Sequence, residues 1–287
     1  MSKKSREIVA WVQVRKLLSK LPILILLLVG AGAMILPYAW MITNSFKSVS
    51  DFLHHPYAWL PQEFTLDTYV NAWVQGRMSI FIMNSFIYAV GVTFIQLSID
   101  SLAAYAFARI DFVGRDIIFL LLLVTMMLPG SVLLIPSYLI IWRLGLVDSY
   151  LGVVFPKFAQ AFGIFLLRQF FLNIPREYED AAVIDGCSKF RIYLTIILPL
   201  AKPVLVTLGI FLFIRQWNDF IWPLVVLSDW RKYPVTVGIA LLHDSLFSWN
   251  WSIIFAALAL ATLPLIIIFF FGQKFIIGGL STSGIKG

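Results

Sequence analysis

The sequence predicts an all-α, polytopic membrane protein with six transmembrane helices and both termini in the cytoplasm, and three observations support this fold class. Hydrophobic residues make up 60% of the 287 residues and charged residues only 13%, whereas soluble domains carry about 25% charged residues. The apolar residues gather in six long stretches, and most lysines and arginines lie between these stretches. A soluble globular protein and a disordered chain are therefore excluded, and the single Cys187 excludes an intramolecular disulfide scaffold.

Each of the six stretches is long enough to cross a bilayer. About 30 Å of hydrocarbon corresponds to about 20 helical residues at ~1.5 Å per residue. The first stretch is longer than the apolar core of a cleaved signal peptide, so we expect it to be retained as a helix. The fourth carries Lys157 directly after Pro156. The predicted spans are Leu21–Ile42, Ile80–Phe107, Ile117–Trp142, Leu151–Leu172, Pro203–Leu227 and Ile253–Phe275.

The distribution of positive charge predicts the orientation, because cytoplasmic loops are enriched in Lys and Arg. With the N-terminus inside, 15 of the 22 lysines and arginines fall in inner segments, six in outer segments, and Arg215 within a span. The whole chain, residues 1–287, is then one membrane domain. Its cytoplasmic segments include residues 1–20, 173–202 and 276–287, and its main outer loops are residues 43–79 and 228–252.

The longest inner loop, between the fourth and fifth spans, has the composition of a short capped helix. Pro175 suits the first turn of a helix, and the acidic residues Glu177, Glu179 and Asp180 favour the positive end of its dipole. Gly186 can adopt the left-handed conformation that ends a helix. From composition alone, an interfacial connector is an equally good interpretation.

A motif in this loop resembles the loop that marks permease subunits of binding-protein-dependent ABC importers. Its fixed positions are an acidic residue, two alanines, a glycine and an Ile-x-Leu-Pro sequence, here Asp180, Ala181, Ala182, Gly186, Ile196, Leu198 and Pro199. The glutamate of the family pattern is Asp180 in this chain, with Glu179 directly before it. Leu102–Arg109, Trp217–Phe220 and the tail Ile285–Gly287 are similar to maltose-type sugar permeases.

The resemblance implies an inner-membrane, ATP-driven importer of a sugar or oligosaccharide. In that family the first helix of the loop is a coupling helix that sits in a cleft on a separate ATP-hydrolysing subunit. We expect the coupling set to be Glu179, Asp180, Ala181, Ala182, Asp185, Gly186, Ile196, Leu198 and Pro199. The implied partners are a second permease chain, two ATPase subunits that hold ATP and Mg²⁺, a soluble sugar-binding protein and membrane lipid, but no nucleic acid.

The chain carries no nucleotide or metal motif of its own. A P-loop is absent from the sequence, and Gly278-Gly279 lacks the lysine that would follow it. The three histidines, His54, His55 and His243, belong to no spaced ligand cluster. We therefore expect no enzymatic activity and no bound cofactor on this chain.

Ionisable residues within the spans suggest a site, because burying a charge in the bilayer is costly. Arg215 and Asp219 are four residues apart and would share one face of the fifth helix. Either the two charges neutralise each other, or they line a sugar path together with Gln216, Trp217, Asn218 and Asp100. In the second case Arg215 could counter an acidic sugar.

The second large outer loop is rich in aromatic residues, and the resemblance implies that this region contacts the sugar-binding protein. Its candidate contact residues are Trp230, Tyr233, Asp244, Phe247 and Trp249. Two other functions remain open at this point. An ion-coupled secondary transporter would usually show an internal repeat, and a membrane-embedded enzyme would need a convergent nucleophile–base or metal set; neither feature is found in the sequence.

Overall fold

The computed structural model describes residues 3–242 and 250–281, and this part of the chain is helical without a β-strand, as the all-α class predicts. Within these residues a single β-bridge joins Lys47 and Phe64, in the predicted first outer loop. The helical segments are α1 (Lys3–Asn44), α2 (Val49–His54), α3 (Asp67–Val74), α4 (Met78–Arg109), α5 (Arg115–Thr125), α6 (Gly130–Arg143), α7 (Tyr150–Val154), η1 (Phe155–Lys157), α8 (Ala161–Leu172), α9 (Glu177–Ile184), α10 (Lys189–Ile192), η2 (Tyr193–Ile197), α11 (Leu198–Leu200), α12 (Lys202–Trp217), α13 (Ile221–Val226), η3 (Trp230–Lys232), α14 (Val235–Leu241) and α15 (Trp251–Ser281).

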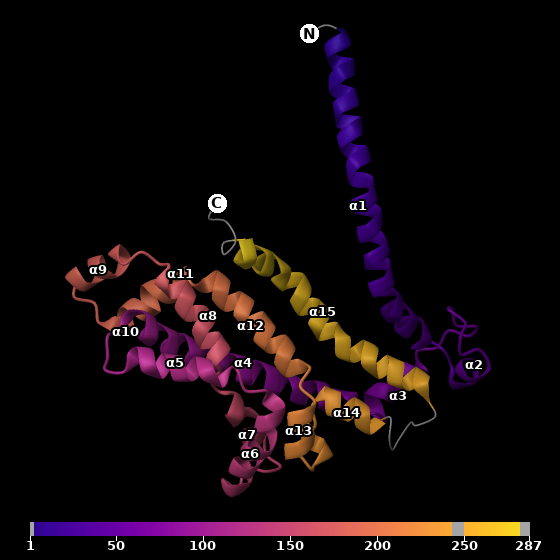
Figure 1. Cartoon of the computed structure of the whole chain (residues 1–287). Coiled ribbons are helices and arrows are strands. Elements are labelled where there is room, and N and C mark those ends of the chain that lie inside the picture. The colour runs from indigo at the N-terminus through magenta and orange to yellow at the C-terminus, as the bar shows by residue number, and fades with distance from the viewer. Residues whose placement is uncertain (1–2, 243–249, 282–287) are drawn as a thin grey trace.

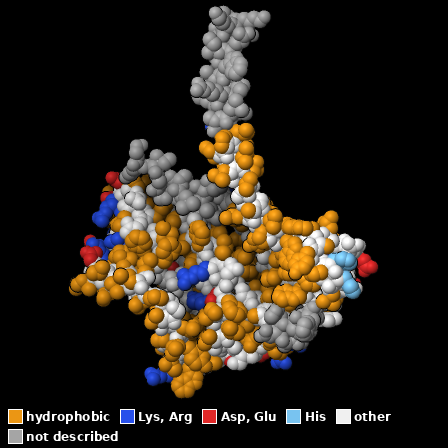
Figure 2. Space-filling model, turned by 45° about the vertical axis from the view of Figure 1, so that its right-hand side comes forward, with side chains coloured by type: hydrophobic (Ala, Val, Ile, Leu, Met, Phe, Trp, Pro, Cys, Tyr) orange, Lys and Arg blue, Asp and Glu red, His pale blue; other side chains and the backbone are white. Residues whose placement is uncertain are grey.

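The long helix α4 is the centre of the bundle (Figure 1). Its most extensive contacts are with α8 and α12, and α15 packs on α12 and on α3. The helix α1 stands apart and touches the rest mainly through α15, where the Trp40 ring lies edge-on to Phe255 at 5.3 Å between centroids. Apolar side chains cover most of the face in Figure 2, and a small group of charged side chains interrupts them near its centre.

Three of the six predicted spans are single unbroken helices. The helical segments Lys20–Asn44, Met78–Arg109 and Trp251–Phe275 are each long and apolar enough to cross a membrane. The other candidates are bent pairs of helices, so the described residues contain three candidate spans, or up to six if each bent pair is one span.

The bends correct the expectation of continuous third, fourth and fifth spans. The third turns by 104° between α5 and α6, where Pro129 has no N–H to continue the helix. The fourth bends by 42° between η1 and α8. The fifth predicted span, Pro203–Leu227, ends as a helix at Trp217 and resumes only at α13. A further bend of 78° separates Lys189–Leu200 from α12.

The predicted first outer loop, residues 43–79, folds as a small unit around a buried lysine. The ammonium group of Lys47 donates to the carbonyl oxygens of His55 and Ala58, and its side chain is fully enclosed. Burial lowers the pKa of Lys47, which the neighbouring Asp51 carboxylate partly offsets. Since Lys47 lies three residues after the end of α1, this cluster holds that end of the helix in place.

Candidate functional site

The predicted coupling loop folds into the short helix α9, and local chemistry explains both of its ends. The acidic residues Glu177, Glu179 and Asp180 occupy its first turn, where negative charge is favourable. Gly186 has φ of +79°. The N–H of Gly186 donates to the Val183 carbonyl at 3.0 Å and the following Cys187 N–H to the Ala182 carbonyl at 2.9 Å. This is the glycine-terminated helix end that the sequence predicts.

The inner face of α9 is tied to the bundle by a buried ion pair. Glu179 and Arg109, the last residue of α4, lie 2.9 Å apart, with only 8% and 3% of their side chains exposed. The same guanidinium donates through Nη2 to the carbonyl oxygens of Phe171 and Ile174 at the end of α8. Arg109 therefore joins α4, α8 and α9 at one point.

A second arginine repeats this arrangement in the opposite direction. Arg168 of α8 donates through Nε to the Phe107 carbonyl of α4 at 3.2 Å, and its guanidinium lies 4.2 Å from the centre of the Phe119 ring of α5. Each of the two helices thus supplies an arginine to carbonyl groups near the other's C-terminus. Because terminal carbonyl groups lack partners within their own helix, the two helix ends hold each other in place.

The segment after α9 is also attached to α4. The Tyr105 hydroxyl donates to the Lys189 carbonyl at 3.2 Å, and the hydroxyls of Ser101 and Tyr193 lie 2.7 Å apart. Tyr193 begins η2, a single π-helical turn. Of the motif residues there, Ile196 and Leu198 are half-buried against the core, whereas Pro199 is exposed.

The face of α9 that points away from the bundle carries apolar and acidic side chains that no other part of the described chain covers. Asp180, Ala181 and Asp185 are exposed. Val183 is exposed, and Ile184 reaches 86%. Glu179 and Ala182 of the predicted coupling set lie instead on the buried face. In this structure Asp180, Ala181 and Asp185 are therefore accessible to a partner, and Glu179 and Ala182 are not; the role of the set in coupling stays a prediction.

The residues predicted to line a path within the membrane do not form one helical face. Because α12 ends at Trp217, Asp219 lies beyond the helix and not one turn after Arg215. Asp219 makes an ion pair with Lys157, and among the described residues Arg215 has neither an ion-pair nor a hydrogen-bond partner. Of the two interpretations of Arg215 and Asp219, the structure does not show the one in which they neutralise each other, because Asp219 pairs with Lys157 instead.

The other path candidates differ in exposure. Trp217 is only 1% exposed, and its Nε1 donates to the Ala261 carbonyl of α15 at 3.1 Å, so its ring belongs to the core in this conformation. Gln216 is buried beside it. Asn218 is exposed and donates to the Ile214 carbonyl at the end of α12.

Asp100 is enclosed in the bundle, where it holds α4 and α8 together. Its Oδ1 accepts from the Gln160 backbone N–H at 3.0 Å, at the start of α8, and its Oδ2 accepts from Gln96 at 3.2 Å. A Cβ on Gly163 would lie 2.1 Å from Oδ2. The carboxylate thus needs a glycine opposite it, and its surroundings are those of a packing residue.

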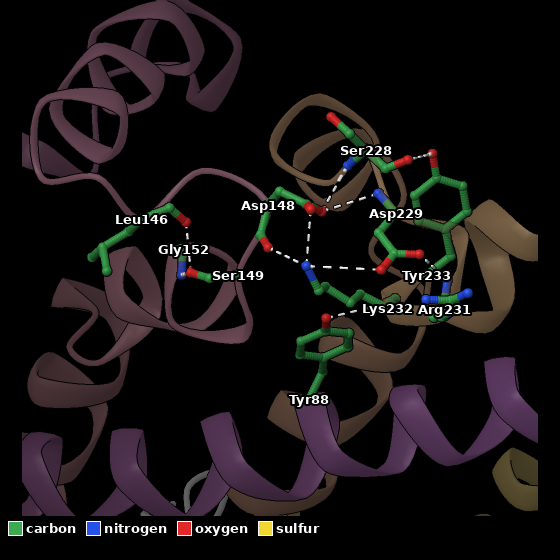
Figure 3. Close-up of polar contacts among 10 residues, drawn as sticks. All are labelled: Tyr88, Leu146, Asp148, Ser149, Gly152, Ser228, Asp229, Arg231, Lys232 and Tyr233. Atoms are coloured by element: carbon green, nitrogen blue, oxygen red, sulfur yellow. Dashed lines mark hydrogen bonds and ion pairs between the residues drawn. The ribbon is translucent and has the colours of Figure 1, made fainter.

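The start of the predicted second outer loop is fixed by a network around Asp148, which lies in the turn between α6 and α7 (Figure 3). The Asp148 carboxylate accepts from the backbone N–H groups of Ser228 and Asp229 at 3.0 Å and from Lys232 Nζ at 2.8 Å. These contacts lower the pKa of Asp148 to about 2, with the Lys232 hydrogen bond as the largest cause. The Tyr88 hydroxyl of α4 donates to the Lys232 carbonyl at 2.9 Å. The loop is therefore anchored to α4 and to the turn between α6 and α7.

Two of the predicted contact residues for the binding protein lie in this anchored part. Trp230 stacks under the Arg77 guanidinium at 3.7 Å from its ring centre, and Tyr233 is half-buried. The other three, Asp244, Phe247 and Trp249, lie outside the described residues, as do His243 and the last residues of the tail.

Comparison with known proteins identifies the family to which this chain belongs. Residues 100–281 match the family described as the inner membrane component of binding-protein-dependent transport systems. The chain belongs to this family. The trehalose/maltose transport system permease protein MalG of Thermococcus litoralis is 35% identical over 92% of this chain and 97% of its own length. The probable ABC transporter permease protein YurM of Bacillus subtilis is 34% identical over 88% of this chain and 83% of its own length.

A solved structure agrees on the fold. The crystal structure of a bacterial ABC transporter involved in the import of the acidic polysaccharide alginate contains a chain with a TM-score of 0.80. It is 24% identical and covers 96% of this permease and 98% of that chain. The resemblance to sugar-importing ABC permeases is therefore confirmed, and the permease is a multi-pass protein of the bacterial inner membrane.

The sequence does not predict the partners of two charged residues that pair in the structure. Arg109 ends one of the segments that resemble sugar permeases, and Lys157 lies within the fourth predicted span. A charge within or at the end of an apolar stretch was the available signal for both. The residues with which they pair, Glu179 and Asp219, are distant in sequence, so only the fold brings each pair together.

Among the described residues of the permease, no group of three or more His, Cys, Asp or Glu side chains lies close enough together to hold a metal ion. His55 faces Asp51 at 3.5 Å, and His54 contacts the Ser50 carbonyl one turn earlier. Gly278 and Gly279 lie inside the helix α15 and not in a loop between a strand and a helix. That the chain binds no cofactor stays a prediction.

Proposed function

We propose that α9 is the coupling helix through which two separate ATP-hydrolysing subunits drive this permease. The complete importer would contain a second permease chain and an external solute-binding protein, with ATP and Mg²⁺ bound by the ATPases. The permease itself would carry the cargo inward by alternating access when the ATPases close.

The two-faced character of α9 carries this proposal. Its inner face is tied to α4 and α8 through Glu179 and Arg109, whereas Ile184 and Asp180 face away from the chain. An exposed apolar surface outside the bilayer is typical of a docking site. A movement of α9 caused by a docked partner would be transmitted through Arg109 to the ends of α4 and α8.

A carbohydrate is the cargo that the relatives favour. Similar chains include permease proteins named for arabinooligosaccharides in Bacillus subtilis and for diacetylchitobiose in Streptomyces coelicolor. These two are 35% and 29% identical to this chain. Their shared cargo chemistry supports a sugar or oligosaccharide as the ligand here, with Arg215, Asn218 and Asp219 near its path and Trp230 and Tyr233 near the binding protein.

The orientation can be tested with the native chain. Cys187 is the only cysteine and follows Gly186 directly, half-exposed. If the coupling loop is cytoplasmic, a membrane-impermeant maleimide labels Cys187 in inverted vesicles and not in intact cells. Labelling from the outside would overturn the proposed topology.

The coupling role is tested by Asp180→Arg and Ile184→Asp in the full importer. We expect less ATPase subunit to co-purify with either affinity-tagged variant than with the wild-type permease. Both variants should also lose cargo-stimulated ATP hydrolysis and transport. Val113→Asp is the matched control, because Val113 is fully exposed on the α4–α5 turn and not on α9. Normal ATPase retention and coupled transport in both α9 variants would refute the proposal.

A further inference from the structure

The segment between α9 and the fifth predicted span lies across the end of that span. It consists of α10, η2 and α11, residues Lys189–Leu200, and in Figure 1 it lies between α9 and the start of α12. Its axis makes an angle of 78° with α12, which begins directly afterwards at Lys202. Because α12 enters the membrane at this point, a segment at such an angle runs nearly parallel to the membrane surface. Amphipathic helices that lie on a bilayer have this orientation.

One face of the segment belongs to the helix bundle. Ile192 and Ile197 are fully buried. The hydroxyls of Tyr193 and Ser101 lie 2.7 Å apart, and the Lys189 carbonyl accepts from the Tyr105 hydroxyl of α4. These contacts fix the rotation of the segment about its own axis, so they also determine which side chains point away from the protein.

The opposite face combines apolar side chains with positive charge. Phe190 and Leu194 are four residues apart, and therefore on one side of the helix, with 60% and 46% of their surface exposed. Lys189, Arg191 and the following Lys202 are exposed as well. None of these three charged side chains has an ion-pair or hydrogen-bond partner among the described residues, and the segment itself contains no acidic residue. The positive charge of this face is therefore not neutralised by the described part of the chain.

The charge and the location of this face fit the lipid of the cytoplasmic leaflet. Basic segments next to a spanning helix are attracted to anionic headgroups there, and neighbouring Phe and Leu side chains can enter the boundary between headgroups and acyl chains. The exposed face of α9 carries Asp180 and Asp185 instead. The loop thus has acidic charge on the helix that we assign to the ATPase and basic charge where the fifth span enters the membrane.

We propose that this face binds anionic phospholipids, with their phosphate groups held by Lys189, Arg191 and Lys202 and their acyl chains in contact with Phe190 and Leu194. Charge-assisted hydrogen bonds from Arg and Lys to phosphate are roughly twice as strong as neutral ones. The inference rests on the proposed cytoplasmic location of the loop and adds a lipid partner beside the coupling helix. Bound lipid would hold the segment that connects α9 to α12 against the membrane surface.

The test places an environment-sensitive dye on this face. Leu194→Cys is made together with Cys187→Ser, so that it is the only cysteine of the permease, in a full importer whose other subunits lack cysteine, and is labelled with the fluorophore NBD. The importer is reconstituted in phosphatidylcholine vesicles that contain a small fraction of phosphatidylglycerol or phosphatidylcholine with a spin-labelled acyl chain. The spin label quenches NBD at close range, so the quenching measures how often each lipid lies beside the dye.

Val183→Cys on α9 is the matched control for position, because Val183 is exposed to a similar extent (49%) on the helix that we assign to the ATPase. Arg115→Gln is the control for charge. It removes one cation from the same side of the membrane, but Arg115 already pairs with Asp111 and Asp116.

We expect blue-shifted emission from position 194 and a preference of about tenfold or more for phosphatidylglycerol over phosphatidylcholine. Lys189→Gln, Arg191→Gln and Lys202→Gln should each reduce this preference about two- to fivefold, Arg191→Lys should retain most of it, and Arg115→Gln should leave it unchanged. Position 183 should show little quenching by either lipid.

Three results would overturn the proposal. An unquenched dye at position 194 would show that water or the ATPase covers this face, equal quenching by both lipids would exclude recognition of the anionic headgroup, and an equal effect of Arg115→Gln would reduce the preference to net charge. Because quenching requires neither ATP nor cargo, a failure of this proposal and a failure of the proposed coupling role are separate outcomes.

Discussion

Breaking the buried pair between Arg109 and Glu179 should release α9 from the bundle. The two groups are 2.9 Å apart and almost fully enclosed, and removing one partner of such a pair costs about 3–5 kcal/mol. Since about 1.4 kcal/mol corresponds to a factor of ten in an equilibrium, 3–5 kcal/mol should raise the open population of α9 about 10²- to 4 × 10³-fold. The effect should appear in both Arg109→Met and Glu179→Met.

Amide hydrogen exchange of the purified importer measures this opening directly. Exchange in α9 should accelerate by the same factor, or until the helix has no protection left, while the α15 amides serve as an internal reference. The double variant should open less than the product of the two single effects, because it leaves no buried charge unpaired. Arg115→Met is the control, since Arg115 pairs with Asp111 on the exposed turn after α4. Strictly additive effects, or unchanged exchange in the single variants, would refute the transmission role of this pair.

Three further predictions concern other contacts. Gly163→Ala should lower the thermal stability by about 1–3 kcal/mol, since its Cβ would lie 2.1 Å from a buried carboxylate oxygen, whereas Gly91→Ala meets nothing within 4 Å and should be tolerated. Gly186→Val should reduce coupled transport more than Gly186→Asn, because φ of +79° disfavours branched residues. The stabilising contact between Asp148 and Lys232 should persist as pH falls from 7 to about 4 and be lost only as pH falls through about 2, because the pKa of Asp148 is lowered from 3.8 to about 2.

Each of these has a simple readout. Melting curves of the detergent-solubilised importer compare the two alanine variants, and equal curves would contradict the close contact. Transport per ATP hydrolysed separates the two Gly186 variants, and equal ratios would show that the left-handed turn is dispensable. Limited proteolysis of the second outer loop across pH follows the Asp148 contact, with Asp148→Asn as control. Loss of protection already between pH 7 and pH 5 in the wild-type protein alone would argue against the lowered pKa.

The sequence predicts the helical class and the location of the apolar stretches, because hydrophobicity over about 20 residues is a strong signal. It does not predict the breaks. A hydropathy average passes smoothly over Pro129 and over the connection around Asp219, since the flanking residues are apolar on both sides. Proline marks one break chemically, but the end of α12 at Trp217 depends on packing against α15.

In the coupling loop, too, features set by neighbouring residues can be predicted from the sequence, and contacts between distant residues cannot. The end of α9 at Gly186 follows from one residue's conformational freedom. The sequence near α9 does not show which acidic residue faces away from the bundle. Glu179 faces inward because it pairs with Arg109 at the end of another helix. Pairs of this kind join residues far apart in the chain, and a single sequence contains no signal that connects them.

The isolation of α1 has a consequence for how the chain tolerates change. No residue in its 18-residue apolar window is buried against the rest of the molecule, and its firm contacts begin near Trp40. Within this chain, exchanging Leu, Ile or Val along the helix disturbs no packed neighbour. Evolutionary drift in that helix should therefore be limited by hydrophobicity and length, while the apolar segment of α15, with 33% of its window buried, bears stricter steric demands.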